Sequence, residues 1–241
     1  IAHAYLNMTC GVNTLDILMD KAVEEPADFK TALSQLVAGV PLQYVTGKAY
    51  FYDRLFSLNT DTLIPRPETE ELVSHVLTCI GTQSLRVLDI GTGSGCIAIS
   101  IALEAPQARV TGWDVAENAI KQAEENAQSL GAEVQFHQQN IFAWQDDAQV
   151  WDIIVSNPPY VLDAEKADMA AHVLDHEPHL ALFVPDADPL LFYRVIGEMA
   201  QERLAPGGYL FFEINRAFGA QNVALAHAQG FENIQILKDF N

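Results

Sequence analysis

The chain has 241 residues, of which 49% are hydrophobic and 19% charged, a composition typical of a globular protein with one sizeable domain and a small additional one. Its 13 Lys and Arg against 32 Asp and Glu give a formal net charge of -19, which argues against a nucleic-acid partner, because proteins that grip phosphate backbones usually carry a basic stripe. No apolar run is long enough to span a bilayer, so no membrane partner is expected, and the three widely spaced cysteines fit a reducing cytoplasm better than a disulfide framework.

The first 64 residues divide into two segments of different character. Residues 1 to 39 are predicted to be helical, because apolar residues recur near helical spacing on both sides of a break at Glu25-Pro26. This stretch is too short to bury a large core alone, so we interpret residues 1–46 as a small helical domain. Residues 47–64 are interpreted as a linker, since the aromatic and apolar residues that flank Asp53-Arg54 predict a β-hairpin.

From residue 65 to residue 241, predicted strands alternate with predicted helices. One helix is expected to begin at Pro67, a residue tolerated in the first helical turn, and to stop at Gly81. A second ends before Pro106, and a third covers Glu117 to Leu130 with Gly131 as its stop. The expected strands lie at 85–90, 108–113, 134–137, 152–155, 209–213 and near 231–237. This alternation predicts an α/β fold with a mostly parallel, doubly wound sheet.

A glycine-rich turn joins the first of these strands to the helix that follows it. Its spacing, Gly91-x-Gly93-x-Gly95, differs from the G-x-G-x-x-G of dinucleotide-binding proteins and from the phosphate loop, which carries a lysine. Glycines let the backbone approach a ligand closely, and a helix N-terminus offers free N–H donors. Asp114 ends the second strand, where an acid accepts hydrogen bonds from ribose hydroxyls in this architecture. Together with Asp89, this pattern favours ligand binding over a purely structural turn.

The turn resembles the nucleoside-binding loop of class I methyltransferases. The resemblance implies a Rossmann-like fold that binds S-adenosyl-L-methionine and releases S-adenosyl-L-homocysteine. The residues that it places at the cofactor are Asp89, Gly91, Thr92, Gly93, Ser94, Gly95, Asp114, Asn140, Ile141 and Asn157. Asn140 and Ile141 would lie at the adenine edge, and Asn140 is interpreted equally well as an ordinary turn asparagine.

The tetrapeptide Asn157-Pro158-Pro159-Tyr160 follows directly on the fourth strand, at the carboxyl edge where ligands bind in open α/β sheets. Two prolines fix φ and remove two backbone donors, so the Pro158 carbonyl is held outward as an acceptor beside the Asn157 side-chain oxygen. Two acceptors aimed at one point select the NH2 group of an amide or aromatic amine. They bind the transition state better than the ground state, because the nitrogen gains positive charge as the methyl group transfers. The candidate catalytic residues are therefore Asn157, Pro158 and Tyr160, with Pro159 completing the substrate-binding set and the Tyr160 ring packing against the target.

Further segments narrow the substrate. Pro41 to Gly47, Leu63 to Glu70, Glu177-Pro178 with Ala181 to Phe183, and Phe212-Glu213-Ile214 resemble the HemK/PrmC family of peptide chain release factor N5-glutamine methyltransferases. The resemblance runs roughly from Pro41 to the end of the chain. It implies methylation of the glutamine in the Gly-Gly-Gln motif of class I release factors by a monomer, with residues 1–46 docking the protein substrate. It also implies a Gly-x-Asp-Arg ending and a last strand beyond Asn241, so a truncated sequence is expected.

Two alternative functions stay open. The first is methylation of the exocyclic amine of an rRNA or DNA base, which uses the same tetrapeptide, although the net charge of -19 argues against it. The second is a non-enzymatic binding module, and the intact tetrapeptide argues against that. No metal is expected, because His176-Glu177-Pro178-His179 has the wrong spacing for paired ligands and Pro178 breaks the helix. A loop over the active site is the better interpretation of that stretch. Arg66 and Glu70 are interpreted as a surface ion pair or, as the resemblance favours, as a pair that closes over the cofactor.

Overall fold

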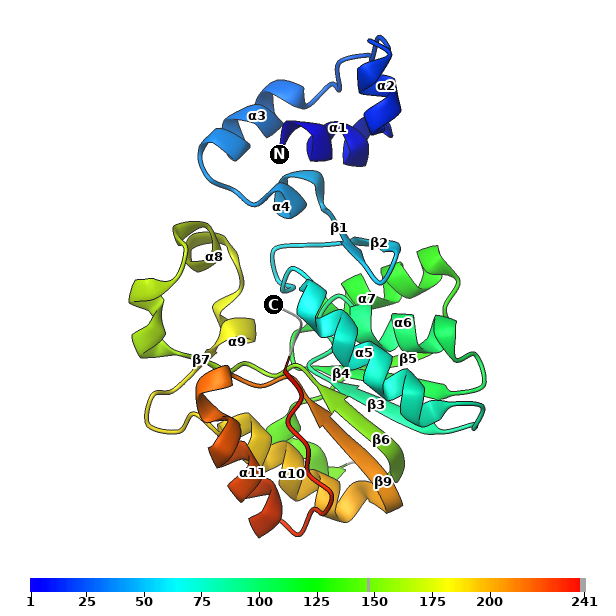
Figure 1. Ribbon diagram of the computed structural model, residues 1–241, viewed down its shortest axis with the longest axis vertical. Helices are drawn as coiled ribbons and strands as arrows, with labels where there is room; N and C mark the ends of the chain where they lie inside the picture. Colours follow the sequence, from blue (N-terminus) through cyan, green and yellow to red (C-terminus); the bar gives the residue numbers. More distant parts are fainter. Residues whose placement is uncertain (147, 239–241) are drawn as a thin grey trace.

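A five-stranded parallel sheet with helices on both faces forms the centre of the protein (Figure 1). The structure is a computed structural model, and it describes residues 1–146 and 148–238. The strands lie in the order β5-β4-β3-β6-β9. Their bounds are Arg86–Ile90 for β3, Arg109–Asp114 for β4, Val134–Gln138 for β5, Trp151–Ser156 for β6 and Leu204–Phe212 for β9. All four pairings are parallel, so the five carboxyl ends meet at one edge of the sheet. The predicted doubly wound α/β fold is confirmed.

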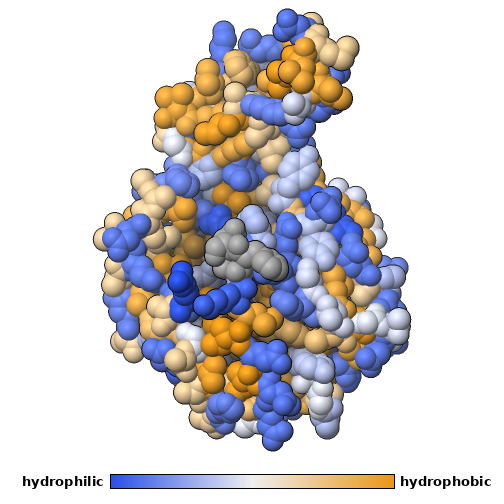
Figure 2. All heavy atoms as spheres, viewed as in Figure 1, coloured by the Kyte–Doolittle hydropathy of each residue, from blue (hydrophilic) through white to orange (hydrophobic). Residues whose placement is uncertain are grey.

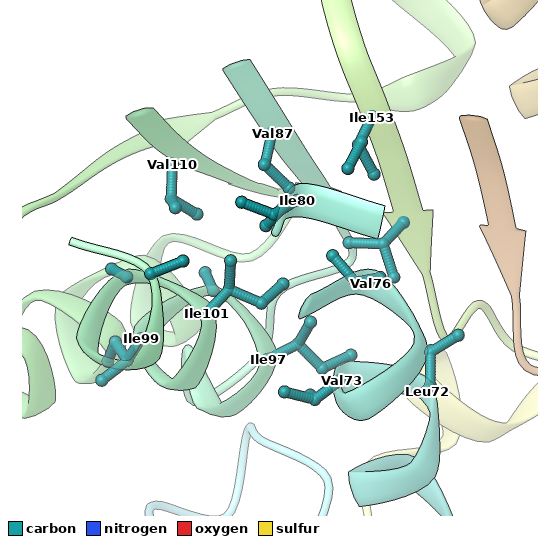
Figure 3. Packing of buried hydrophobic residues seen from close by; sticks show 14 of the residues in the cluster. Leu72, Val73, Val76, Ile80, Val87, Ile97, Ile99, Ile101, Val110 and Ile153 are labelled. Carbon is teal, nitrogen blue, oxygen red and sulfur yellow. The ribbon is translucent and has the colours of Figure 1, made fainter. Parts of the chain in front are cut away.

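Three helices cover one face of the sheet: α5 (Pro67–Ile80), α6 (Cys96–Glu104) and α7 (Glu117–Leu130). Local signals set their ends, since a proline lies in the first turn of α5 and a left-handed Gly131 stops α7, as predicted. Side chains of α5 and α6 point toward those of the strands (Figure 3). The fully buried members include Val73, Val76, Ile80, Ile101, Val87 and Ile153. Because such a core is close-packed, truncating one of these isoleucines to alanine costs about 2–5 kcal/mol.

The opposite face is covered by the 3-10 helix η1 (Ile141–Asp146) and by α10 (Leu191–Arg203), and α11 (Gly219–Ala228) packs beside α10. Leu88 and Ile154 of the strands pack there against Ile196 and Met199 of α10. Successive residues of a strand point to opposite faces, so Val87 joins the first core while its neighbour Leu88 joins this one. Buried apolar layers on both faces hold the strand ends, and thus the edge of the sheet, in fixed positions.

The amino-terminal helices lie at one end of the molecule and connect to the sheet through a hairpin (Figure 1). The helices are α1 (Ala2–Cys10), α2 (Thr14–Leu18), α3 (Phe29–Val37) and α4 (Leu42–Thr46), and the hairpin strands are β1 (Lys48–Phe51) and β2 (Arg54–Ser57). Phe51 and Phe56 of the hairpin are buried in the core beneath α5 and α6. Ser57 and Asn126 of α7 exchange two hydrogen bonds of 2.8 and 2.9 Å. The hairpin is thus fastened to the sheet's helices. Within the described residues no helix is both long enough and apolar enough to cross a membrane.

A series of short elements lies between β6 and α10. It contains β7 (Val161–Leu162), the 3-10 helix η2 (Asp163–Asp168), α8 (Ala171–His176), α9 (His179–Leu182) and β8 (Phe183–Val184). The two short strands pair in parallel and close the segment on itself. The stretch predicted as a loop over the active site therefore contains two short helices, and Glu177-Pro178 separates them, since α8 ends before Glu177 and α9 begins after Pro178.

The predicted sixth strand is wrong, because residues 231–238 form none. A strand needs a neighbour for its backbone hydrogen bonds, and β9 pairs only with β6 among the described residues. Ile236 and Leu237 are left 48% and 58% exposed, so the apolar pattern that predicted the strand has no sheet to cover here. Residues 239–241 lie outside the described residues, and the Gly-x-Asp-Arg ending and last strand expected beyond Asn241 stay a prediction.

Candidate active site

A cavity of about 290 Å³ opens at the carboxyl edge of the sheet. Segments that leave β3, β4, β5 and β6 line it, together with residues from α9 and α10. The predicted site residues on its wall are Gly91, Thr92, Gly93, Ser94, Asp114, Asn140, Ile141, Asn157, Pro158 and Pro159. Asp89, Gly95 and Tyr160 lie outside the lining. The sheet thus brings together segments that are far apart in sequence, because parallel strands end at a common edge.

The three glycines of the turn have different structural roles. Gly91 and Gly93 have φ of +74° and +54°, and a Cβ at either position would meet no protein atom within 4 Å. Both line the cavity, so the missing side chains leave open space beside the backbone. Gly95 is different, since its Cβ would come within 2.8 Å of the Ile99 side chain and 3.1 Å of the Ala123 Cβ. Gly95 therefore permits the close packing of α6 on α7 and has no contact with the cavity.

Two carboxylates accept hydrogen bonds from residues of the glycine turn. Asp89 is fully buried, and its Oδ2 accepts a 2.7 Å hydrogen bond from the Thr92 hydroxyl. Burial raises the pKa of Asp89 to about 7, because a buried site disfavours the charged form. Asp114 accepts from the Gly93 N–H and from the Ala116 N–H, each at 2.9 Å. Burial raises the pKa of Asp114 as well. Asp114 fixes the turn and the start of α7, and it also lines the cavity.

The wall beyond β5 combines a turn asparagine with an aromatic pair. Asn140 Oδ1 accepts a 2.9 Å hydrogen bond from the Phe142 N–H, which is the geometry of an ordinary turn asparagine, and Asn140 also lines the cavity. The Phe142 and Phe192 rings lie 5.5 Å apart between centroids, and both line the cavity. Sequence reasoning missed both phenylalanines. Phe192 belongs to α10, a helix that the sequence analysis did not predict, so nothing placed it near β5.

The tetrapeptide leaves β6 beside the glycine turn. The Ser156 hydroxyl donates a 2.6 Å hydrogen bond to the Ile90 carbonyl, which fixes the end of β6 against the end of β3. Asn157 Nδ2 donates to the Thr69 Oγ1 at 3.3 Å. The nitrogen side of the Asn157 amide is thus directed to the start of α5. Pro158 is buried, and Asn157, Pro158 and Pro159 all line the cavity.

Tyr160 points away from the cavity toward a carboxylate at the end of β9. Its hydroxyl donates a 3.0 Å hydrogen bond to Glu213 Oε1, and the Thr69 hydroxyl donates a 2.6 Å bond to Glu213 Oε2. Burial raises the pKa of both Tyr160 and Glu213. Tyr160 is therefore held by its hydroxyl, and the packing of its ring on a substrate stays a prediction. Glu213 received no role from the sequence, although it lies in one of the segments that carry the family resemblance.

Arg66 pairs with Glu177 and so ties the segment of α8 and α9 to the start of α5. Its Nη2 lies 2.6 Å from Glu177 Oε1, and the Glu177 side chain is 1% exposed. Glu70, the expected partner, instead accepts a 2.9 Å hydrogen bond from the Tyr52 N–H. Arg66 does line the cavity, as do Pro178, Leu180 and Ala181 of the following segment. Among the described residues, no group of three or more His, Cys, Asp or Glu side chains is placed to hold a metal ion.

Comparisons with known proteins identify the family of this chain. The family described as Methyltransferase small domain matches residues 68–182. A release factor glutamine methyltransferase of Bacteroides thetaiotaomicron is 45% identical over 235 residues, which are 95% of this chain and 84% of that protein. This chain belongs to the release factor glutamine methyltransferase family. Another member, from Flavobacterium psychrophilum, is 46% identical over 88% of this chain and 75% of its own length.

A solved structure supports the fold of this release factor glutamine methyltransferase family member. The T. thermophilus 16S rRNA N2 G1207 methyltransferase, determined in complex with AdoMet and guanosine, aligns with a TM-score of 0.53. The alignment covers 76% of this chain and 44% of that chain at 16% identity. At such identity the likeness shows the fold alone, which is that of a class I methyltransferase. The family resemblance found in the sequence is confirmed.

Proposed function

We propose that this chain transfers a methyl group from S-adenosyl-L-methionine to the N5 amide nitrogen of the glutamine in the Gly-Gly-Gln motif of class I peptide chain release factors. The observation that carries the proposal is Asn157, which lies on the cavity wall with its amide nitrogen bonded to Thr69. Its oxygen is thereby left to accept a hydrogen bond from a target NH2. Relatives 45% and 46% identical are release factor glutamine methyltransferases. Methylation of a nucleic-acid base is not favoured by these relatives or by the net charge of -19.

The residues around the cavity fit S-adenosyl-L-methionine. The open space beside Gly91 and Gly93, where no side chain projects, gives a ligand access to the backbone of the turn. Asp114 presents the carboxylate that suits ribose hydroxyls, and Asn140 and Ile141 would lie at the adenine edge. When bound, S-adenosyl-L-methionine supplies a methyl group on a positively charged sulfur, which is a good leaving group.

Asn157 and Pro158 would select and orient the target nitrogen. A side-chain amide is a weak nucleophile, because its lone pair is delocalised. The Asn157 oxygen and the Pro158 carbonyl would accept its two hydrogens and hold the nitrogen in one orientation. Those hydrogens become stronger donors as the nitrogen gains positive charge, so the two acceptors stabilise the transition state more than the ground state. No side chain has to remove a proton from the amide beforehand, and the cationic nitrogen loses one proton to water after the methyl group has transferred. Tyr160 and Pro159 would complete the substrate pocket.

We further propose three functional segments: residues 1–46 as a substrate-docking domain, 47–64 as a linker and 65–241 as the methyltransferase domain. Hydrophobic side chains gather on the surface of the amino-terminal helices (Figure 2). Leu18, Met19 and Val37 are 76%, 79% and 82% exposed, and apolar surface of this kind suits a protein partner. One chain carries both the docking helices and the cavity, so the proposed unit is a monomer. It would act in the cytoplasm, where release factors work.

The test is transfer of labelled methyl from S-adenosyl-L-methionine to purified release factor. Three other acceptors are compared with it: release factor with Gln→Ala in its Gly-Gly-Gln motif, DNA and ribosomal RNA. Label is expected on the intact release factor and on none of the other three. Label on nucleic acid but not on release factor would refute the proposal.

The variant Asn157→Ala tests the role of the tetrapeptide. Removal of one acceptor that strengthens in the transition state is expected to lower kcat by about 100- to 1,000-fold, by analogy with the loss of one oxyanion-hole donor. Calorimetry should still show cofactor binding. The matched control is Asn222→Ala on α11, whose amide donates to the Phe218 carbonyl and which does not line the cavity. If Asn157→Ala loses cofactor binding as well, Asn157 mainly builds the cofactor pocket.

A further inference from the structure

Glu213 lies directly behind the tetrapeptide. Its backbone N–H donates to the Ser156 carbonyl at 3.1 Å, so the ends of β9 and β6 are side by side. Its carboxylate accepts from the Thr69 hydroxyl at 2.6 Å and from the Tyr160 hydroxyl at 3.0 Å. The side-chain amide of Asn157 donates to the Thr69 Oγ1 at 3.3 Å, so Glu213 and Asn157 share Thr69 as a partner. One carboxylate therefore accepts from α5 and from the last residue of the tetrapeptide, and the first residue, Asn157, reaches it through Thr69.

We infer that Glu213 is a positioning residue that holds the Asn157 carboxamide with its nitrogen turned inward and its oxygen turned to the substrate. An ionised carboxylate only accepts hydrogen bonds, so it can face the NH2 side of an amide but not the oxygen side. The nitrogen and oxygen of a carboxamide lie on opposite sides of one axis. The Thr69 hydroxyl gives its proton to Glu213 and can therefore only accept from Asn157, so the nitrogen faces Thr69 and the oxygen is directed away from both. This inference rests on the proposed function, for which the oxygen is the needed atom.

The opposite orientation of the Asn157 amide would defeat the selection. A carboxamide turned by 180° would present its own NH2 to the target NH2, so two donors would face each other. The pair of acceptors would be reduced to the Pro158 carbonyl alone. Nothing in the shape of an asparagine side chain prevents this turn, because its oxygen and NH2 group are nearly the same size. The chemical identity of the group behind it decides the orientation.

The charge state of Glu213 adds a pH dependence. Burial raises its pKa, and the nearby Glu68 of α5 raises it further, while the donors from Thr69, Tyr160 and Asn157 lower it. Two other groups face this cluster: Tyr193 of α10, whose hydroxyl donates to the Glu213 carbonyl, and Arg66, whose charge acts on Tyr160. Protonation would put an O–H donor among these donors and release the Asn157 amide. We therefore expect kcat to fall on the acid side at a pH above the ordinary range of a glutamate.

The first experiment is Glu213→Gln, which keeps the size of the side chain and replaces one acceptor by an NH2 donor. On release factor, kcat should fall at least tenfold and lose its acid limb, while the cofactor Kd and the melting temperature stay near the wild-type values. The control Glu68→Gln leaves Glu213 and its partners in place and removes a negative charge near Glu213. It should therefore keep the plateau kcat and move the acid limb to lower pH. A Glu213→Gln enzyme with wild-type kcat and an unchanged acid limb would overturn the inference.

The second experiment does not depend on substrate. In protein labelled with 15N-asparagine, the side-chain NH2 resonances of Asn157 are assigned by their loss in Asn157→Ala. We expect them to titrate with Glu213 in the wild-type protein and to be pH-independent in Glu213→Gln. Should that variant fail to fold, the wild-type titration decides, because resonances insensitive to pH would overturn the inference. Wild-type protein that fails to methylate release factor but shows this titration would refute the proposed function and leave the orientation of Asn157 established.

Discussion

Replacement of Asp114 by alanine tests whether the acid at the end of β4 binds the cofactor. A ribose presents two hydroxyls, and hydrogen bonds to a charged acceptor contribute about 1.5–3 kcal/mol each. Asp114 is partly open to solvent and its oxygens already accept from Gly93 and Ala116, so values at the low end apply. We expect a loss of about 2–4 kcal/mol in binding free energy, which corresponds to about 30- to 1,000-fold in Kd.

Asp114→Ala also leaves the N–H groups of Gly93 and Ala116 without their acceptor. A second variant therefore distinguishes an effect on the turn from an effect on ligand binding. Asp114→Asn keeps one acceptor but sets an NH2 against the N–H of Gly93 or of Ala116. It should therefore lose affinity too, by less than alanine. The control is Glu117→Gln, which removes a neighbouring charge that pairs with Lys121 on the surface of α7. That control should leave the Kd within twofold of the wild type.

Calorimetry with S-adenosyl-L-methionine and S-adenosyl-L-homocysteine measures these differences. Burial raises the pKa of Asp114, so the wild-type affinity should decline as the pH falls through a range above that of an ordinary aspartate. The Asp114→Asn variant lacks the titrating group and should show no such decline from this position. A Kd for Asp114→Ala within twofold of the wild type would refute the ribose role and leave Asp114 as a support of the turn.

Three further predictions concern stability and docking. Burial raises the pKa of Asp89 from 3.8 to about 7, so the folded protein favours the protonated carboxyl. The free energy of unfolding of the wild type, measured by urea titration and compared with that of Asp89→Asn, should therefore fall by on the order of 4 kcal/mol as the pH rises from 4 to 7. Arg66→Ala leaves the buried Glu177 carboxylate without its cation and should lower the free energy of unfolding by about 2 kcal/mol, less than for a fully buried pair because the Arg66 side chain is 31% exposed. Leu18→Glu on the exposed face of α2 should raise the KM for release factor by about tenfold without changing kcat, since an apolar contact at an interface contributes about 1–2 kcal/mol.

A matched variant gives each of these three predictions an outcome that would contradict it. Parallel pH curves for the wild type and Asp89→Asn would contradict the raised pKa. The double variant Arg66→Ala with Glu177→Gln should be more stable than Arg66→Ala alone, and equal stability would mean that the buried charge is not the cause. Tyr209→Glu places a charge on another exposed hydrophobic residue, in β9, so an equal rise in KM there would exclude a specific role for the amino-terminal helices.

Where the sequence carried a local signal, the prediction of secondary structure was accurate. The helix expected from Pro67 to Gly81 is α5, and the helix expected from Glu117 to Leu130 has those bounds in the structure. A proline in the first turn and a glycine after the last act within a few residues, so no knowledge of the rest of the fold is needed. The five strands of the sheet were found for a similar reason, since each is a short segment with apolar residues between helix or turn signals.

Features that depend on distant neighbours were not predicted. The apolar run near residues 231–237 has the composition of a strand, but no described strand lies beside it to complete the pairing. Arg66 was interpreted as the partner of Glu70, four positions along the chain, yet its partner is Glu177, 111 positions away. A pattern within one segment does not contain the position of another segment, so spacing alone could not decide either case.

In the tetrapeptide, the Asn157 side chain likewise has one property that its residue type sets and another that distant residues set. Its residues identify the oxygen and the carbonyl that can accept hydrogens from an amide, and this follows from residue type and the rigidity of two prolines. Which way the Asn157 amide faces is set by Thr69, 88 positions earlier, and by a carboxylate at the end of β9. The same four residues without an acceptor behind them would present an NH2 group as readily as an oxygen. The reaction class can therefore be predicted from the motif, whereas the orientation that makes the motif selective comes from the fold that brings the ends of β6 and β9 together.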